Sequence, residues 1–133
     1  MKKVIFACVH NAGRSQMAAA FFNQAANPAL ARAESAGTNP ADKVHPEVVD
    51  AMKDLGIDLS KAKPQKLTEN LAQGAHLLIT MGCGDQCPHV PGLLRDDWPL
   101  QDPKGGSPDH VRAIRDAIGQ RVSELIANNK WQR

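Results

Sequence analysis

Two short, largely apolar runs, each leading into a loop that contains cysteine, place the strongest constraint on how this chain folds. Val4–Ala7 runs into Cys8, and His76–Met81 runs into a turn-rich loop with two further cysteines. Apolar runs of this length are typical of strands that are covered on both faces of a parallel sheet. If the two strands are neighbours, both cysteine loops leave the sheet side by side.

Helical patterns and weaker strand patterns fill the rest of the chain. We expect further strands at 31–35 and 93–98, and helices at 17–25, 44–55, 67–72 and 108–126. The last helix has the clearest start, because Ser107 is a good N-cap and Pro108 suits the first helical position. Strands that alternate with helices indicate a parallel sheet with helices on both faces. The sequence therefore predicts one domain over residues 1–133, a three-layer α/β/α fold with a four-stranded parallel sheet.

Composition and charge exclude several classes of function. A net charge of +2, with 4% aromatic residues and no Tyr, argues against a nucleic-acid-binding surface. No apolar stretch approaches the roughly 20 residues that span a bilayer, and no signal-peptide core follows Met1. We expect a cytoplasmic monomer that binds neither nucleic acid nor membrane. In that compartment its three cysteines should be reduced thiols.

The loop after the first strand has a C-x5-R-S pattern that suits an oxyanion. It reads Cys8-Val9-His10-Asn11-Ala12-Gly13-Arg14-Ser15. Between a strand and a helix, such a loop directs its backbone N–H groups and the positive helix end at one point, so we expect all of Val9 to Ser15 to bind the oxyanion. Gly13 lets the chain curl, and Arg14 offers a fork of donors to two oxygens. The same field should hold Cys8 as a thiolate, placed for in-line attack on the central atom.

The neighbours of the thiol and the position of the loop support this interpretation. Ser15 can donate a hydrogen bond to the sulfur, and Asn11 can hold the loop conformation. The plain alternative is that Cys8 is a small buried residue and Arg14 a surface charge, because C-x5-R is common by chance. The junction of the first strand and a helix favours the anion site, since doubly wound sheets bind phosphate there. A Walker nucleotide loop is excluded, because its pattern does not occur in the chain.

Four segments resemble the low-molecular-weight protein tyrosine phosphatase superfamily and, within it, the thiol-dependent arsenate reductases. They are 8–18, 34–38, the loop with Cys83 and Cys87, and Asp102-Pro103. Together they cover nearly the whole chain. The resemblance implies a four-stranded parallel sheet, Cys8 as the nucleophile, Arg14 as the oxyanion-binding residue and Asp102 as the general acid.

The chain also departs from the superfamily pattern. Lys104 stands where tyrosine phosphatases carry an aromatic residue after Asp-Pro, so the grip on a phosphotyrosine ring is missing. Ala19 stands where many members carry a Glu linked to a potassium ion, so we predict no metal. No tightly bound cofactor is expected either.

Cys83 and Cys87 have three possible roles. They are buried small residues, or ligands of a zinc site with Cys8 and His89, or a redox pair. A loop rich in Gly, Asp, Gln and Pro argues against burial, and C-x3-C-x-H is not a strong zinc-finger spacing. Three residues between two cysteines let a flexible loop bring them to disulfide distance. We favour the redox pair.

The favoured function is arsenate reduction by a three-thiol relay. Cys8 attacks arsenate, Cys83 attacks Cys8 and releases arsenite, and Cys87 resolves the Cys8–Cys83 disulfide. A thioredoxin-type dithiol protein then reduces the Cys83–Cys87 pair. The alternatives are an arsenate reductase that uses glutathione or mycothiol, a phosphomonoester phosphatase, and a non-enzymatic oxyanion or metal sensor.

The other polar residues have ordinary interpretations. We expect Arg112, Arg115 and Arg121 on the solvent-exposed face of the last helix, and His10 to point outward. His45-Pro46 is interpreted as a helix start.

Overall fold

The computed structural model describes residues 1–81, 93–101 and 103–133. Its sheet has four parallel strands in the order β2-β1-β3-β4, which confirms the predicted sheet. The strands are β1 Lys2–Cys8, β2 Ala31–Gly37, β3 Leu77–Thr80 and β4 Leu94–Asp97. Strands β1 and β3 are neighbours, in register from Val4↔Leu77 to Ala7↔Thr80. The C-terminal ends of β1 and β3 therefore lie side by side at the same end of the sheet.

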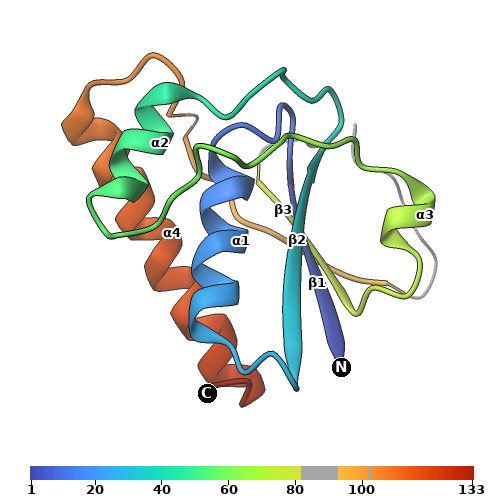
Figure 1. Cartoon of the computed structure of the whole chain (residues 1–133). Helices are drawn as coiled ribbons and strands as arrows, with labels where there is room; N and C mark the ends of the chain where they lie inside the picture. The colour runs from blue at the N-terminus through green and yellow to red at the C-terminus, as the bar shows by residue number, and fades with distance from the viewer. Residues whose placement is uncertain (82–92, 102) are drawn as a thin grey trace.

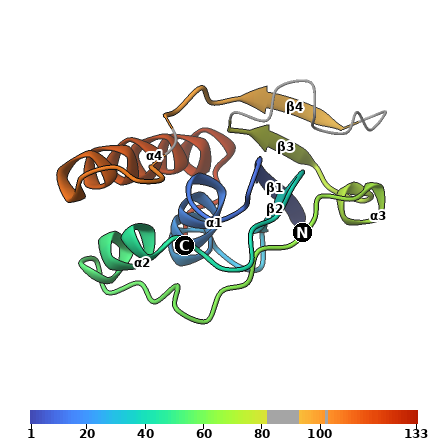
Figure 2. The same ribbon diagram turned by 90° about the horizontal axis from the view of Figure 1, so that it is seen from above.

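Four helices cover the sheet unequally. They are α1 Arg14–Ala25, α2 Pro46–Lys53, α3 Glu69–Ala72 and α4 Pro108–Asn129. Helices α1, α2 and α4 lie on one side of the sheet and the short α3 on the other (Figure 2). The larger core lies under the three helices, where Phe6, Met17, Phe22, Met52 and Ile118 are fully buried. The predicted three-layer fold is confirmed, with a thin second helical layer.

The last helix begins where the sequence predicts it. The Ser107 hydroxyl accepts a hydrogen bond from the backbone N–H of His110 at 3.2 Å, and Pro108 is the first helical residue. The apolar face from Val111 to Ile126 packs against the core. None of the described helices is long and apolar enough to cross a membrane.

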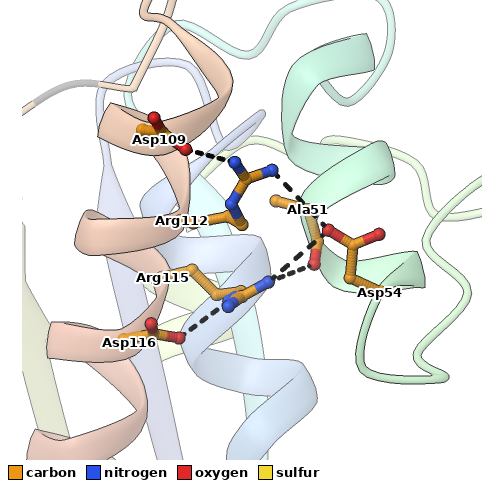
Figure 3. A network of polar contacts seen from close by, with 6 residues as sticks. All are labelled: Ala51, Asp54, Asp109, Arg112, Arg115 and Asp116. Carbon is orange, nitrogen blue, oxygen red and sulfur yellow. Dashed lines mark hydrogen bonds and ion pairs between the residues drawn. The ribbon is translucent and has the colours of Figure 1, made fainter.

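The prediction for one arginine of α4 is wrong. Arg115 is 7% exposed, and its guanidinium donates a hydrogen bond from Nη1 to the backbone oxygen of Ala51 at 2.8 Å (Figure 3). It also bonds Asp116 at 2.8 Å and lies 4.0 Å from Asp54. The side chain crosses to the end of α2, which spacing along α4 alone does not reveal. Arg112, by contrast, is partly exposed as expected.

Candidate active site

The candidate site forms where β1 ends and α1 begins, at the end of the sheet away from both chain termini (Figure 1). Cys8 is the last residue of β1 and Arg14 the first of α1. Both side chains are buried, at 3% and 8% exposure. They line a small hollow with His10, Ala12, Gly13 and His45. The structure thus brings the predicted cysteine and arginine to one cavity.

A short hydrogen-bond chain leads to the thiol. The Cys8 Sγ lies 2.9 Å from the Ser15 Oγ, and the Asn11 Nδ2 donates to that same Oγ at 2.8 Å. Because the amide nitrogen can only donate here, the Ser15 hydroxyl accepts from Asn11 and its own proton is left for the sulfur. The predicted Ser15 contact is therefore present.

Two residues that the sequence analysis missed hold Asn11 in place. Its Oδ1 accepts from the backbone N–H of Gln65 at 2.9 Å and from the Gln16 Nε2 at 3.1 Å. Both are donors, so the amide oxygen faces them and the amide nitrogen faces Ser15. Asn11 is itself in the left-handed backbone region, with φ 50°, which Asn tolerates better than most residues. Gln65 is 54 positions away in sequence, so no local pattern signals this contact.

Two glycines make room for the close contacts around the loop. A Cβ at Gly37, the last residue of β2, would lie 2.6 Å from the Val9 carbonyl oxygen and 2.9 Å from the Asn11 nitrogen. A Cβ at Gly13 would lie 3.0 Å from Pro103 Cγ. Gly13 has φ −141°, so its missing side chain matters here more than a left-handed conformation. Because it has no side chain, Gly37 lets the end of β2 pack directly against the loop after β1.

The chain around position 102 touches the same loop. Arg14 donates from Nη1 to the backbone oxygen of Leu100 at 2.8 Å, and Pro103 packs against Gly13. Asp102 itself lies outside the described residues, so its predicted role as general acid stays a prediction.

The relay cysteines also lie outside the described residues, as does His89. The last described residue before them, Met81, lies beside β1, since its backbone N–H donates to the Ala7 oxygen at 2.7 Å. Within residues 1–81, 93–101 and 103–133, no group of three His, Cys, Asp or Glu side chains is placed to hold a metal ion. The zinc alternative would need residues beyond these ranges.

The fold and the hollow together define a class of protein that holds a tetrahedral oxyanion over a cysteine thiol at the end of a parallel strand. The family model described as low molecular weight phosphotyrosine protein phosphatase matches residues 3–133. The chain belongs to this family, which confirms the resemblance seen in the sequence.

Curated relatives are arsenate reductases by name. A Halobacterium salinarum protein with the provisional name arsenate reductase is 39% identical over 125 residues, covering 91% of this chain and 88% of the relative. The glutaredoxin arsenate reductase of Synechocystis is 35% identical over 130 residues, covering 96% of this chain and 98% of the relative.

Solved structures agree with this grouping. The thioredoxin-dependent arsenate reductase of Corynebacterium glutamicum has a TM-score of 0.83 and 38% identity; the match covers 96% of this chain and 61% of that longer chain. An arsenate reductase in its oxidized state has a TM-score of 0.84 and 34% identity, covering 96% and 98%.

Proposed function

We propose that this chain reduces arsenate to arsenite, with Cys8 as the nucleophile and Cys83 and Cys87 as the relay. The observation that carries the proposal is the buried Cys8 thiol, 2.9 Å from the Ser15 hydroxyl and in one hollow with Arg14. The names of the relatives support arsenate as the substrate.

The first step joins sulfur to arsenic. Arg14 and the backbone N–H groups of residues 9–15 hold the oxyanion, and the Cys8 thiolate attacks the arsenic atom. One oxygen leaves as water, protonated by Asp102. The product is a thioester-like Cys8–arsenic adduct in which arsenic is still in the +5 state.

The second and third steps move two electrons from thiols to arsenic. The Cys83 thiolate attacks the Cys8 sulfur, a Cys8–Cys83 disulfide forms, and the sulfur–arsenic electron pair stays with arsenic, which leaves as arsenite. The Cys87 thiolate then attacks Cys83, and Cys8 is released as a thiolate. The Cys83–Cys87 disulfide is left to be reduced by an external dithiol, so each turnover consumes one dithiol.

We propose a thioredoxin-type protein as that dithiol, in the cytoplasm, with this chain acting as a monomer. Relatives that carry different reductants in their names, thioredoxin and glutaredoxin, support a dithiol protein over a small thiol. Repeated reduction of the relay requires a reducing compartment, which supports the cytoplasm.

The test is arsenate-dependent NADPH oxidation with thioredoxin and thioredoxin reductase, run in parallel with glutaredoxin and glutathione. We expect multiple turnovers only when all three cysteines are present. Cys87→Ser should release about one arsenite per enzyme and stop with a Cys8–Cys83 disulfide, found by peptide mapping. Full multiple-turnover activity of Cys87→Ser or of Cys83→Ser would refute the three-thiol relay. No arsenate-dependent NADPH oxidation by the intact chain with either reductant system would refute the reductase proposal itself.

A further inference from the structure

His45 lies at the anion site, although the sequence marks it only as a helix start. It precedes α2, and its backbone N–H donates to the Ala12 oxygen at 2.9 Å. Its own carbonyl oxygen accepts from Val48 and Val49 at 3.0 and 3.1 Å. The residue is therefore fixed between the oxyanion loop and the first turn of α2.

The imidazole of His45 is part of the wall of the hollow. It lines the cavity together with Cys8 and Arg14. Its Cδ2 lies 3.7 Å from where a Cβ at Gly13 would be, so the ring edge rests on the oxyanion loop. The side chain is half-buried, and its ring makes no hydrogen bond or ion pair with any residue that the structure describes. A histidine is also a poor choice as an N-cap residue, and here its side chain caps nothing.

The second histidine of the hollow is engaged elsewhere. The His10 Nδ1 lies 3.0 Å from the Asn39 backbone oxygen, and a carbonyl oxygen can only accept, so this nitrogen carries the proton. A neutral His10 ring then has an acceptor at its other nitrogen, which an oxyanion would repel. His45 has no such commitment among the described residues, so either of its nitrogens can carry a proton and donate.

We propose that His45 is a substrate-contacting residue whose ring N–H donates to an oxygen of the bound oxyanion. This inference deepens the proposed function, because the ligand is the tetrahedral oxyanion held above Cys8. The described residues that line the hollow include Arg14 and none that carries a carboxylate, so the charge of the hollow favours an anion. A neutral and a protonated imidazole both have an N–H to offer, and the protonated form adds a charge-assisted hydrogen bond.

The test measures anion binding without any reduction of arsenate. In a Cys83→Ser, Cys87→Ser background, Cys8 is the last thiol, and inorganic phosphate should protect it from alkylation by iodoacetamide. His45→Phe keeps a ring and loses the donor, and we expect it to raise the half-protecting phosphate concentration about tenfold, the usual effect of one lost charge-assisted hydrogen bond. His45→Gln keeps a donor and should raise it by no more than about threefold. His110→Phe, an exposed histidine of α4, is the matched control and should not change it.

The possible outcomes separate a hydrogen bond from packing. Unchanged protection in His45→Phe would overturn the proposal, and so would equal weakening in His45→Phe and His45→Gln. If His45→Phe alters the alkylation rate without phosphate or lowers the Tm, His45→Ala replaces it and should show the same tenfold loss. In the intact chain, the proposal also expects a raised KM for arsenate with kcat nearly unchanged. Phosphate protection that depends on His45 in a chain without arsenate turnover would refute the proposed reduction and leave this inference standing.

Discussion

Replacing Arg115 by Met should destabilise the fold, because Arg115 donates a hydrogen bond to a carbonyl oxygen in the last turn of α2. The last four carbonyl oxygens of a helix have no partner within it. In α2, the Asp50, Met52 and Lys53 oxygens accept from backbone N–H groups of residues 54–57, at 2.9 to 3.3 Å. The Ala51 oxygen instead accepts from the Arg115 Nη1 at 2.8 Å (Figure 3). Arg115→Met keeps the apolar stem and leaves the buried Ala51 carbonyl without this donor.

The size of the effect follows from these contacts. A hydrogen bond from a charged group contributes about 1.5–3 kcal/mol. The ion pairs with Asp116 and Asp54 add little, since these carboxylates are 64% and 57% exposed. We therefore expect a loss of about 2 kcal/mol in the free energy of unfolding. With an unfolding entropy of about 2.1 cal/mol/K per residue, this lowers the Tm by roughly 7 °C.

Arg112→Met is the matched control on the same helix. Arg112 lies 4.0 Å from the same Asp54 and pairs with Asp109, but its side chain is 41% exposed and that of Asp109 is 93% exposed. We expect a loss below about 0.5 kcal/mol, or less than about 2 °C in Tm. Thermal and urea denaturation of both variants measure the difference. A fall of less than about 3 °C for Arg115→Met, or equal falls for the two variants, would refute the reasoning.

Three further predictions concern the loop around Cys8. Ser15→Ala removes the donor that is 2.9 Å from the sulfur and should change the rate of Cys8 alkylation by iodoacetamide at neutral pH, while Ser15→Thr, which keeps the hydroxyl, should leave the rate near that of the intact chain. Gln16→Met removes one of the two donors to the Asn11 side-chain Oδ1 and should slow the alkylation of Cys8 at neutral pH a few-fold. An unchanged rate would mean that the Gln65 backbone N–H alone orients the Asn11 amide. Gly37→Ala places a Cβ 2.6 Å from the Val9 oxygen, so it should lower the free energy of unfolding by about 1–3 kcal/mol and weaken the protection of Cys8 by phosphate. Gly74→Ala is a comparison without a clash: a Cβ there meets nothing within 4 Å, so this variant measures only the cost of a side chain at a positive φ.

Much of the fold follows from the sequence because it depends on local patterns. The run Val4–Ala7 predicts a covered strand, and in the structure these residues are fully buried as the middle of β1. The signals at Ser107 and Pro108 place the start of α4 at the right residue. Strand lengths are less well predicted, since β2 extends to Gly37 through pairing with β1 rather than through its own composition.

Only part of the candidate site can be predicted, because local sequence patterns do not reveal residues that come from other parts of the chain. Cys8, Arg14 and Ser15 lie at the two ends of one short loop, so their spacing alone indicates that their side chains are close together. Gln65 and His45 reach that loop from other parts of the chain, through contacts with Asn11 and Ala12. Neither residue has a pattern of its own, because a backbone N–H donor and a ring edge leave no signature in a sequence.

Helix α2 connects Arg115, which the sequence analysis placed wrongly at the solvent-exposed face of α4, with His45, which it interpreted only as a helix start. Its C-terminal end is held by Arg115 from α4, and its N-terminal end carries His45 at the hollow. Its first turn is tied to the chain after position 102, because Glu47 accepts from the Gly105 N–H at 3.3 Å. A short helix behaves as one rigid unit. Loss of the Arg115 contact at one end of α2 should therefore shift the His45 imidazole at the other end, in addition to lowering the free energy of unfolding. Arg115→Met should therefore weaken phosphate protection of Cys8 while Arg112→Met does not. If protection survives in a destabilised Arg115→Met protein, the backbone bond between His45 and Ala12 alone is enough to place the ring.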